Sequence, residues 1–337
     1  MIERGRRSRW WQRKGSKARG FTYVDKDGRT INAREHIERI NALVIPPAWK
    51  YVRINPSTGG RIQVVGMDAA GRVQYRYHPS YTEKQNRKKY AKLERFGKQL
   101  PKLKVRTNED ISADGLPLEK VLAVVLRLIN SLYFRVGTDH SARHYKTFGV
   151  TTLHKKHLKI GRKGKLEFSF VGKSHIEHRK VLVDEELASI IKELLNLRRG
   201  RKLFRYLNGD GTPHPIRPSQ INAYIKSVTD PEFSSKDFRT WGGTLLAAVK
   251  LAEMGPAEDE KEAKKNIVRA VKQVAHELGN TPAVCRSSYI HPAIIDAYTK
   301  GITIEEFKPS KKRHIKRISL DLEPEEKALL KLLASGN

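Results

Sequence analysis

The stretch LEKVLAVVLRLINSL, residues 118–132, carries the clearest fold signal in the sequence. Its apolar residues recur at i, i+3, i+4 and i+7, and this period predicts a helix with one buried stripe. Pro117 precedes it, where the first turn of a helix tolerates proline. Three strand-like segments follow at 157–160, 166–171 and 176–183, separated by glycine-containing turns, and these predict a small antiparallel sheet.

Beyond this sheet the sequence predicts more helices. Asp184 is expected to cap a helix whose aliphatic face begins at Leu187. Further helical patterns fall near 218–228, 239–254, 260–278 and 291–299. Residues 109–305 are therefore expected to form a mainly helical domain with one small inserted sheet.

The preceding part of the chain has a different pattern. Residues 21–108 contain short β-rich segments, such as FTYV (21–24) and YVRI (51–54), separated by turns rich in glycine and proline. This pattern predicts a small, mainly antiparallel sheet, followed by a basic helix at 82–99 and a domain boundary at residue 108, marked by Pro101 and the polar stretch at 107–110. The expected fold class is α+β, with a small β-rich N-terminal domain and a mainly helical domain that contains a small antiparallel sheet.

Charge dominates the composition. The 337 residues include 67 Lys and Arg against 36 Asp and Glu, a formal net charge of +31. Such an excess predicts attraction to a polyanion, and nucleic acid is the leading candidate; a merely soluble basic protein or a ribosome-associated one is the alternative. Residues 1–20 are expected to form a flexible basic arm, and 306–337 a basic tail with a short helix beginning near Pro324.

The single cysteine, Cys285, excludes an internal disulfide framework and a cysteine-based zinc site. The sequence contains no run of 18 apolar residues, so no transmembrane helix is expected. Residues 1–20 have no apolar segment of the kind that a secretory signal requires. We therefore expect no membrane association and a reducing compartment; a bacterial cytoplasm, a virion and a nucleus are all compatible with this.

Five polar residues stand out as a candidate catalytic set: Arg135, Lys173, Arg239, Asn280 and Tyr289. Each has an ordinary explanation when it is considered alone. An arginine is most often a surface or phosphate-clamping residue, and a lysine in a hairpin turn is usually solvated. An asparagine after a helix is usually a cap or turn residue, and a tyrosine is usually half-buried packing.

With their surroundings, these residues resemble the type IB DNA topoisomerases of the poxvirus and bacterial kind. The catalytic part of that family is matched, in order, by FRVGTDHSARHYKTFGVTTLHKKH (134–157), FVGK (170–173), the K-x-x-R segment (236–239) and LGNTPAVCRSSYIHP (278–292). Its N-terminal part is matched by GFTYVDKDGRTI (20–31), VIPPAW (44–49) and GRVQYRYHP (71–79). The resemblance covers about residues 20–300. It implies a tyrosine recombinase/topoisomerase IB-like fold in which 21–108 clamps DNA and 109–305 is catalytic.

The resemblance also implies a role for each residue. Tyr289 attacks phosphorus, forms a 3′-phosphotyrosyl bond and releases a 5′-hydroxyl, so that the duplex can swivel before it is resealed. Arg135 and Arg239 grip the phosphate oxygens and supply the cationic setting that a phenol with an ordinary pKa of about 10 needs. Lys173 protonates the departing 5′ oxygen, and Asn280 donates a hydrogen bond to a non-bridging oxygen.

Asn280 departs from the poxvirus and eukaryotic pattern, which has histidine at this position, whereas bacterial members commonly carry asparagine. An amide can donate a hydrogen bond but cannot supply a proton, so an acid role at this position is in doubt. His276 lies four residues earlier and is expected on the helix surface or in packing rather than as a replacement.

No cofactor is expected. A covalent intermediate conserves the energy of the phosphodiester bond, so ATP is not needed, and the sequence has no G-x-x-x-x-G-K-[ST] loop. The closest histidine groups are the pairs at 154 and 157 and at 175 and 178, and no cluster has convincing metal-ligand spacing.

The expected partner is double-stranded DNA, bound by a monomer. The segment QYRYH (74–78) would suit an edge strand that packs its tyrosines, or a strand that contacts DNA. The resemblance favours Gln74, Tyr75 and Tyr77 as DNA contacts, with Lys236 near the cleaved phosphate. The residues PPAW (46–49) are expected to shape the core of the small domain instead.

Two other functions are compatible with parts of this pattern. A tyrosine recombinase shares the arginines, the hairpin lysine and the tyrosine, but it usually has H-x-x-R where this chain has Lys236-x-x-Arg239, and it lacks the motifs at 20–79. A DNA-binding protein that had lost catalysis would not be expected to keep all of Arg135, Lys173, Arg239 and Tyr289.

Overall fold

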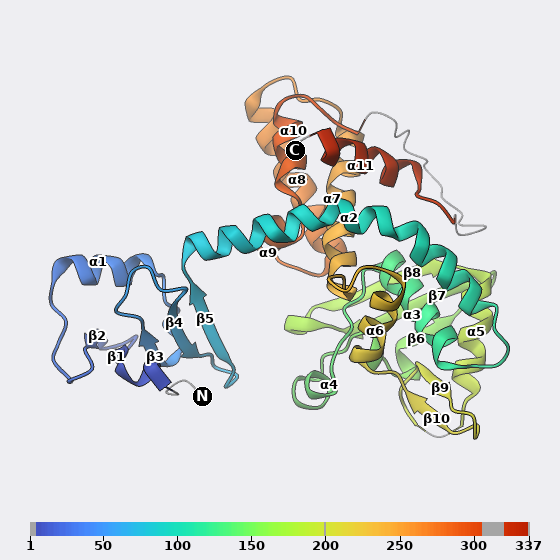
Figure 1. The fold of residues 1–337 in the computed structure, drawn as a ribbon, viewed down its shortest axis with the longest axis horizontal. Helices are drawn as coiled ribbons and strands as arrows, with labels where there is room; N and C mark the ends of the chain where they lie inside the picture. Colours follow the sequence, from blue (N-terminus) through green and yellow to red (C-terminus); the bar gives the residue numbers. More distant parts are fainter. Residues whose placement is uncertain (1–4, 199, 305–319, 336–337) are drawn as a thin grey trace. The chain divides into compact units, whose positions relative to one another are not determined.

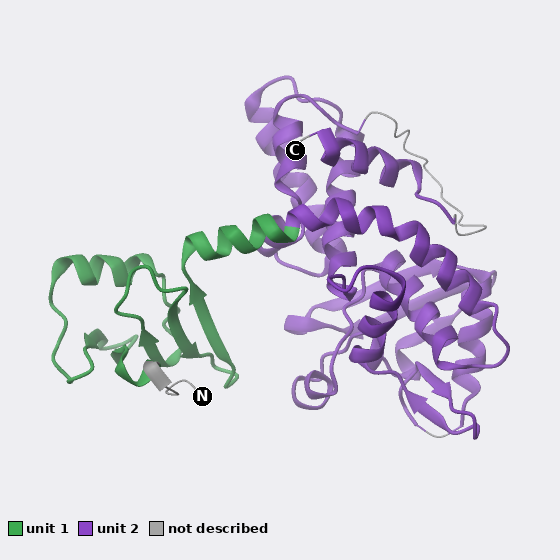
Figure 2. Cartoon of the chain, viewed as in Figure 1, with its two compact units in different colours: residues 1–89 green, residues 90–337 purple. Residues whose placement is uncertain are grey.

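The computed structural model describes residues 5–198, 200–304 and 320–335. The chain divides into two compact units, Met1–Lys89 and Tyr90–Asn337 (Figures 1 and 2). The division falls within helix α2 (Pro79–Ile111), whereas the sequence suggested residue 108. The reason is that Leu93 and Phe96, in the middle of α2, are buried in the core of the second unit.

The first unit is a five-stranded antiparallel sheet in the order β2-β1-β3-β4-β5. Its elements are η1 (Gly5–Arg9), β1 (Trp11–Ser16), β2 (Gly20–Val24), α1 (Arg34–Ala42), β3 (Lys50–Ile54), β4 (Ile62–Met67) and β5 (Val73–Tyr77). Its core contains Ile40, Val52, Ile54 and Val64. Trp49 packs against this core and would contact a Cβ at Gly66, which confirms that the PPAW segment shapes the small domain.

The expectation of a flexible arm over residues 1–20 is wrong for its second half. Strand β1 lies inside the sheet, where it pairs with β2 and β3. Arg13 donates hydrogen bonds to the carbonyls of Pro46 and Trp49, and its guanidinium lies 4.2 Å from the centre of the Phe21 ring. At least this basic residue is used to hold the strand in place. Residues 1–4 lie outside the described part.

The second unit is mainly helical. Its first half contains α3 (Leu118–Leu132), α4 (Asp139–Tyr145), η2 (Val150–Thr152), η3 (Lys155–His157), β6 (Leu158–Ile160), β7 (Lys165–Val171), η4 (Lys173–His175), β8 (Glu177–Val183) and α5 (Glu185–Asn196). Its second half contains β9 (Arg205–Leu207), β10 (Pro213–Pro215), α6 (Pro218–Val228), α7 (Ser235–Met254), α8 (Glu260–Leu278), α9 (Pro282–Ser288), α10 (Pro292–Thr299) and α11 (Pro324–Ser335).

Most of the predicted elements of this unit are confirmed. Strands β6, β7 and β8 form a three-stranded antiparallel sheet, and Asp184 caps α5 by accepting from the Leu187 amide at 2.9 Å. Helix α3 differs from its prediction, because its residues 120–129 are all buried rather than one stripe alone. Its two buried charged residues have partners: Lys120 donates to the Ala113 carbonyl, and Arg127 pairs with Glu186.

The sequence predicted that helix α2 would end near residue 99. The helix instead continues through Pro101 to Ile111. A buried stripe runs along it on both sides of the proline and includes Leu100 and Leu103, so packing outweighs the local cost of Pro101. No helix within the described residues is both long enough and apolar enough to cross a membrane.

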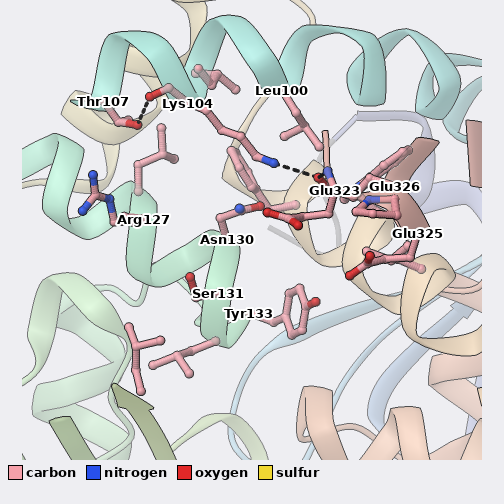
Figure 3. A pocket seen from close by; sticks show the side chains of 18 of the residues that line it. Leu100, Lys104, Thr107, Arg127, Asn130, Ser131, Tyr133, Glu323, Glu325 and Glu326 are labelled. Carbon is pink, nitrogen blue, oxygen red and sulfur yellow. Dashed lines mark hydrogen bonds and ion pairs between the residues drawn. The ribbon is translucent and has the colours of Figure 1, made fainter. Parts of the chain in front are cut away.

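A large cavity lies between α2, α3, α7 and the start of α11. Figure 3 shows Lys104 of α2 reaching across to Glu326 of α11, and Tyr133 at the end of α3 lining the same space. The Lys104 amine lies 2.7 Å from the Glu326 carboxylate, and both side chains are buried. This ion pair fastens α11 to the unit, although the predicted basic segment before it, residues 308–317, lies outside the described part.

Candidate active site

The end of helix α8 organises the candidate site. Gly279 closes the helix in the left-handed conformation, with φ of 58°, as its predicted position after the last turn requires. The backbone amide of Asn280 then donates to the Ala275 carbonyl at 2.9 Å. This turn leaves the carbonyl groups of Leu278 and Gly279 available to side chains from other elements.

Arg135 reaches this turn from the segment that follows α3. That helix ends at Tyr133, which is left-handed with φ of 55° and so redirects the chain. The Arg135 guanidinium donates to the Leu278 and Gly279 carbonyls, at 3.4 and 3.1 Å, and to the side-chain oxygen of Asn280. Two of the predicted site residues, Arg135 and Asn280, are thus in direct contact.

Arg239 approaches the same carbonyl from the first part of α7. It donates to the Leu278 carbonyl at 2.8 Å and to the Tyr133 carbonyl, and only 4% of its surface is exposed. Its Nε atom is buried and has no hydrogen-bond partner. The two arginines therefore share one acceptor, the carbonyl of Leu278.

The site holds two positive charges, and the nearby carboxylate of Glu277, which lines the same small pocket as Arg135, is paired with Lys180 instead. Within the described residues, neither Arg135 nor Arg239 forms an ion pair; their guanidinium groups donate to carbonyl and amide oxygens. Burial, together with the charge of Arg239, lowers the pKa of Arg135 to about 10. Burial also lowers the pKa of Arg239, which the Tyr289 phenol partly opposes. Two like charges that are withdrawn from water are costly unless an anion lies between them, so this pair of arginines is suited to binding an anion.

Asn280 adds a neutral donor. Its side-chain oxygen accepts from Arg135, which fixes the orientation of the amide. Its Nδ2 atom is buried and donates to no group in the structure. A buried donor without a partner costs free energy, and such groups are often kept for a ligand.

Tyr289 lies beside the arginines at the end of α9. Its ring centre is 5.1 Å from the Arg239 guanidinium carbon. Its backbone is held on both sides, because its amide donates to the Cys285 carbonyl at 2.9 Å and its carbonyl accepts from the Thr244 hydroxyl at 3.2 Å. The predicted nucleophile is therefore anchored next to the predicted phosphate site.

Two consecutive glycines of α7 make room for two tyrosines. A Cβ at Gly243 would lie 2.7 Å from the Tyr289 carbonyl oxygen and 3.0 Å from its Cβ. A Cβ at Gly242 would overlap the ring of Tyr133, the residue whose carbonyl holds Arg239. Close approach to α7 at these two points requires the absence of a side chain.

Lys173 lies at the tip of the β7–β8 hairpin, as predicted, and its side chain is exposed. The next two residues, Ser174 and His175, are both left-handed, with φ of 64° and 58°. Below the tip, the Gly172 amide donates to the Ile176 carbonyl at 2.8 Å. Lys173 and Arg135 line one small pocket, so the hairpin places Lys173 at the edge of the arginine site.

His178 lines the same pocket and was not identified from the sequence as a site residue. It is buried, and its ring stacks on Phe170 with centres 5.1 Å apart. Burial, and then the charges of Arg135, Lys180 and Arg239, lower the pKa of His178 to about 4. The sequence indicated only that His178 faces inward in an alternating strand, and an ordinary core residue has the same pattern. His276, in contrast, is exposed, as expected.

The predicted DNA-contacting residues lie on surfaces. In the first unit, Tyr75 and Tyr77 are 37% and 44% exposed on the edge strand β5, and their rings stack with centres 6.1 Å apart. Gln74 is half-buried and donates to Asp68 at 2.9 Å. In the second unit, Lys236 is exposed in the first turn of α7. No group of three or more His, Cys, Asp or Glu suited to a metal ion occurs among the described residues.

Comparison with known proteins identifies the family. The family described as eukaryotic DNA topoisomerase I, catalytic core, matches residues 78–318, and the bacterial DNA topoisomerase IB N-terminal domain matches residues 20–68. The chain belongs to the type IB DNA topoisomerases. This topoisomerase is 32% identical to DNA topoisomerase 1B of Acanthamoeba polyphaga mimivirus over 285 residues, which cover 82% of this chain and 84% of the viral protein.

More distant viral relatives match over a similar range. DNA topoisomerase 1B of vaccinia virus (strain Copenhagen) is 23% identical, over 70% of this chain and 72% of its own length. DNA topoisomerase 1 of rabbit fibroma virus (strain Kasza) is 25% identical, over 83% and 90%. The two family matches together extend from residue 20 to residue 318, so helix α11 of this topoisomerase lies beyond both of them.

Proposed function

We propose that this topoisomerase relaxes supercoiled double-stranded DNA by cleaving one strand through Tyr289, allowing rotation and religating it, without ATP. The observation that carries the proposal is the pair of guanidinium groups at the end of α8, that of Arg239 buried beside the Tyr289 ring and that of Arg135 half-buried, with no carboxylate paired to either among the described residues. A phosphodiester is the anion of fitting charge and shape, because planar guanidinium groups bind its oxygens in pairs.

In the cleavage step the Tyr289 phenolate oxygen bonds to phosphorus while the bond from phosphorus to the 5′ oxygen breaks. Arg135 and Arg239 neutralise the charge that develops on the non-bridging oxygens, and the unpaired Nδ2 of Asn280 donates a further hydrogen bond. Lys173 gives its proton to the departing 5′ oxygen. Religation is the reverse: the 5′-hydroxyl attacks, Lys173 takes the proton back, and Tyr289 leaves.

Contacts outside the chemistry would position the duplex. We assign this role to Tyr75 and Tyr77, whose exposed stacked rings face away from the core of the first unit, to Gln74 beside them, and to Lys236 of the second unit. The enzyme is proposed to act as a monomer.

The test is plasmid relaxation in EDTA without ATP. The wild type is expected to relax positively and negatively supercoiled plasmid, and Tyr289→Phe, which lacks the attacking oxygen, is expected to bind DNA and relax none. Peptide mapping of the covalent adduct should identify Tyr289. Relaxation by Tyr289→Phe at the wild-type rate would overturn the proposal, and strand exchange between two duplexes without simple relaxation would indicate a recombinase.

A further inference from the structure

His178 lies between two backbone segments that each lead into a candidate site residue. A Cβ at Gly172, the residue before Lys173, would lie 2.5 Å from the imidazole Cδ2. A Cβ at Gly279, the residue before Asn280, would lie 2.8 Å from the imidazole Nε2. The ring therefore fills the space between the lysine hairpin and the end of α8, with glycine on both sides.

The ring is fixed from the hairpin side. His178 is paired with Phe170 across the β7–β8 ladder, and the two rings are stacked with an interplanar angle of 21°. Only 9% of the His178 surface is exposed. Because burial and the neighbouring charges of Arg135, Lys180 and Arg239 hold its pKa near 4, the ring is neutral at neutral pH and adds no charge to the arginine site.

The arginines and the tip of the hairpin are each held by hydrogen bonds that do not involve this ring. Arg135 and Arg239 are tied to the end of α8 by their own hydrogen bonds to Leu278 and Gly279. The tip of the hairpin is bonded within itself, through the Gly172 amide and the Ile176 carbonyl. A second link between the hairpin and α8, the ion pair of Lys180 with Glu277 at 2.5 Å, lies farther along β8.

We propose that His178 is a positioning residue that holds the lysine-bearing hairpin against the Gly279–Asn280 turn, so that the Lys173 amine and the arginine site act on the same phosphodiester. The inference rests on the proposed function of Lys173 as the acid. Loss of the ring should therefore weaken protonation of the leaving oxygen more than it weakens phosphate binding.

The experiment compares two leaving atoms under single turnover. After the cleavage site has been mapped from covalent adducts, a duplex is prepared with either oxygen or sulfur at the bridging 5′ position of that site. A thiol with a pKa of about 8.5 leaves without an acid, unlike an alcohol. Rates of adduct formation are measured for the wild type and for His178→Ala, His178→Gln, Lys173→Ala, Asn280→Ala and Lys180→Met.

We expect His178→Ala to cleave the oxygen duplex about 10- to 100-fold more slowly than the wild type, which is part of the roughly 10²- to 10⁴-fold that acid catalysis contributes, and the sulfur duplex within about 3-fold of the wild-type rate. His178→Gln, which retains a planar end group, should recover part of the rate with oxygen. Lys180→Met removes the other link and should have the smaller effect with oxygen. The thermal unfolding midpoint and DNA affinity of each variant show whether it is folded.

The outcomes separate the two proposals. If Lys173→Ala is not restored by sulfur, the acid role of Lys173 fails. If Lys173→Ala is restored but His178→Ala is equally slow with both duplexes, or cleaves the oxygen duplex at the wild-type rate, the positioning role of His178 is wrong. Asn280→Ala should remain slow with sulfur, because its donor acts on a non-bridging oxygen.

Discussion

At the scale of single residues, the site is defined by groups that lack a partner. Among the described residues, the Nδ2 atom of Asn280 and the Nε atom of Arg239 are both buried donors without an acceptor. An unsatisfied buried donor destabilises the fold, so other hydrogen bonds must hold these two side chains in place. Arg135 holds the Asn280 side chain by donating to its amide oxygen.

Asn280→Ala removes one of these donors. Single-turnover cleavage is expected to fall about 10²- to 10³-fold, the usual effect of losing one donor to a developing oxyanion, while DNA affinity at the same salt concentration changes little. Asn280→Asp should be slower still, because a carboxylate would neutralise Arg135 and repel the phosphate. A wild-type cleavage rate in Asn280→Ala would exclude the amide from the reaction.

Acid should destabilise the protein through buried histidines. Burial is the largest cause that lowers the pKa values of His157 and His178 to about 4, below the ordinary 6.5. Between pH 4 and pH 6.5 these histidines bind protons in the unfolded chain but not in the folded chain. The stability that the folded protein gains from keeping them neutral is therefore complete above about pH 6.5 and is lost as the pH falls toward 4. The thermal midpoint should drop between pH 7 and pH 5, and the drop should be smaller in His178→Gln; an equal drop would contradict this.

At the scale of elements, the sequence predicts best where burial is periodic. The apolar run at 118–132 and the alternating strands of the β6–β8 sheet were found at nearly their observed limits. Helix α1 was missed because only Ile40 of its nine residues is buried, which leaves no apolar period to detect. Strand β1 was missed because its sequence, WQRKGS, is as basic as a solvated tail.

The candidate site could be predicted as a set of residues but not as an arrangement. Arg135 and Asn280 are 145 positions apart, and no local pattern indicates that they share a hydrogen bond. Their grouping came from the resemblance to a family. His178 was missed because its role depends on two glycine contacts, at Gly172 and Gly279, that arise only when the hairpin and α8 are folded together.

The attachment of α11 can be tested through its buried ion pair. Glu326→Ala leaves the Lys104 amine buried with the Asp321 carbonyl as its one acceptor among the described residues, which should lower the free energy of unfolding by about 3–5 kcal/mol. The double variant Lys104→Met with Glu326→Leu should recover most of the lost free energy of unfolding. Lys327→Ala, which breaks an exposed pair between this helix and Asp321 before it, should cost less than about 1 kcal/mol. Chemical denaturation measures all three, and equal losses in the two single variants would contradict the assignment.

At the scale of the whole molecule, the net charge of +31 should govern DNA affinity. If six to ten phosphates are contacted, binding should weaken by about 10³- to 10⁵-fold between 50 and 200 mM salt. Lys236→Ala should reduce the slope of log affinity against log salt by about one, because one phosphate contact is lost. Fluorescence anisotropy of a labelled duplex measures the slope, and a slope that does not change in the variant would remove Lys236 from the phosphate contacts.

The adjacent glycines of α7 give Tyr289 and Tyr133 the space that side chains at these two positions would take. Gly243 admits the backbone of Tyr289, and Gly242 admits the ring of Tyr133. A single added methyl group at either position would displace a tyrosine while leaving every charge and every hydrogen-bonding group of the protein chemically intact. The proposed cleavage should thus be sensitive to crowding at Gly242 and Gly243 as well as to the loss of an arginine.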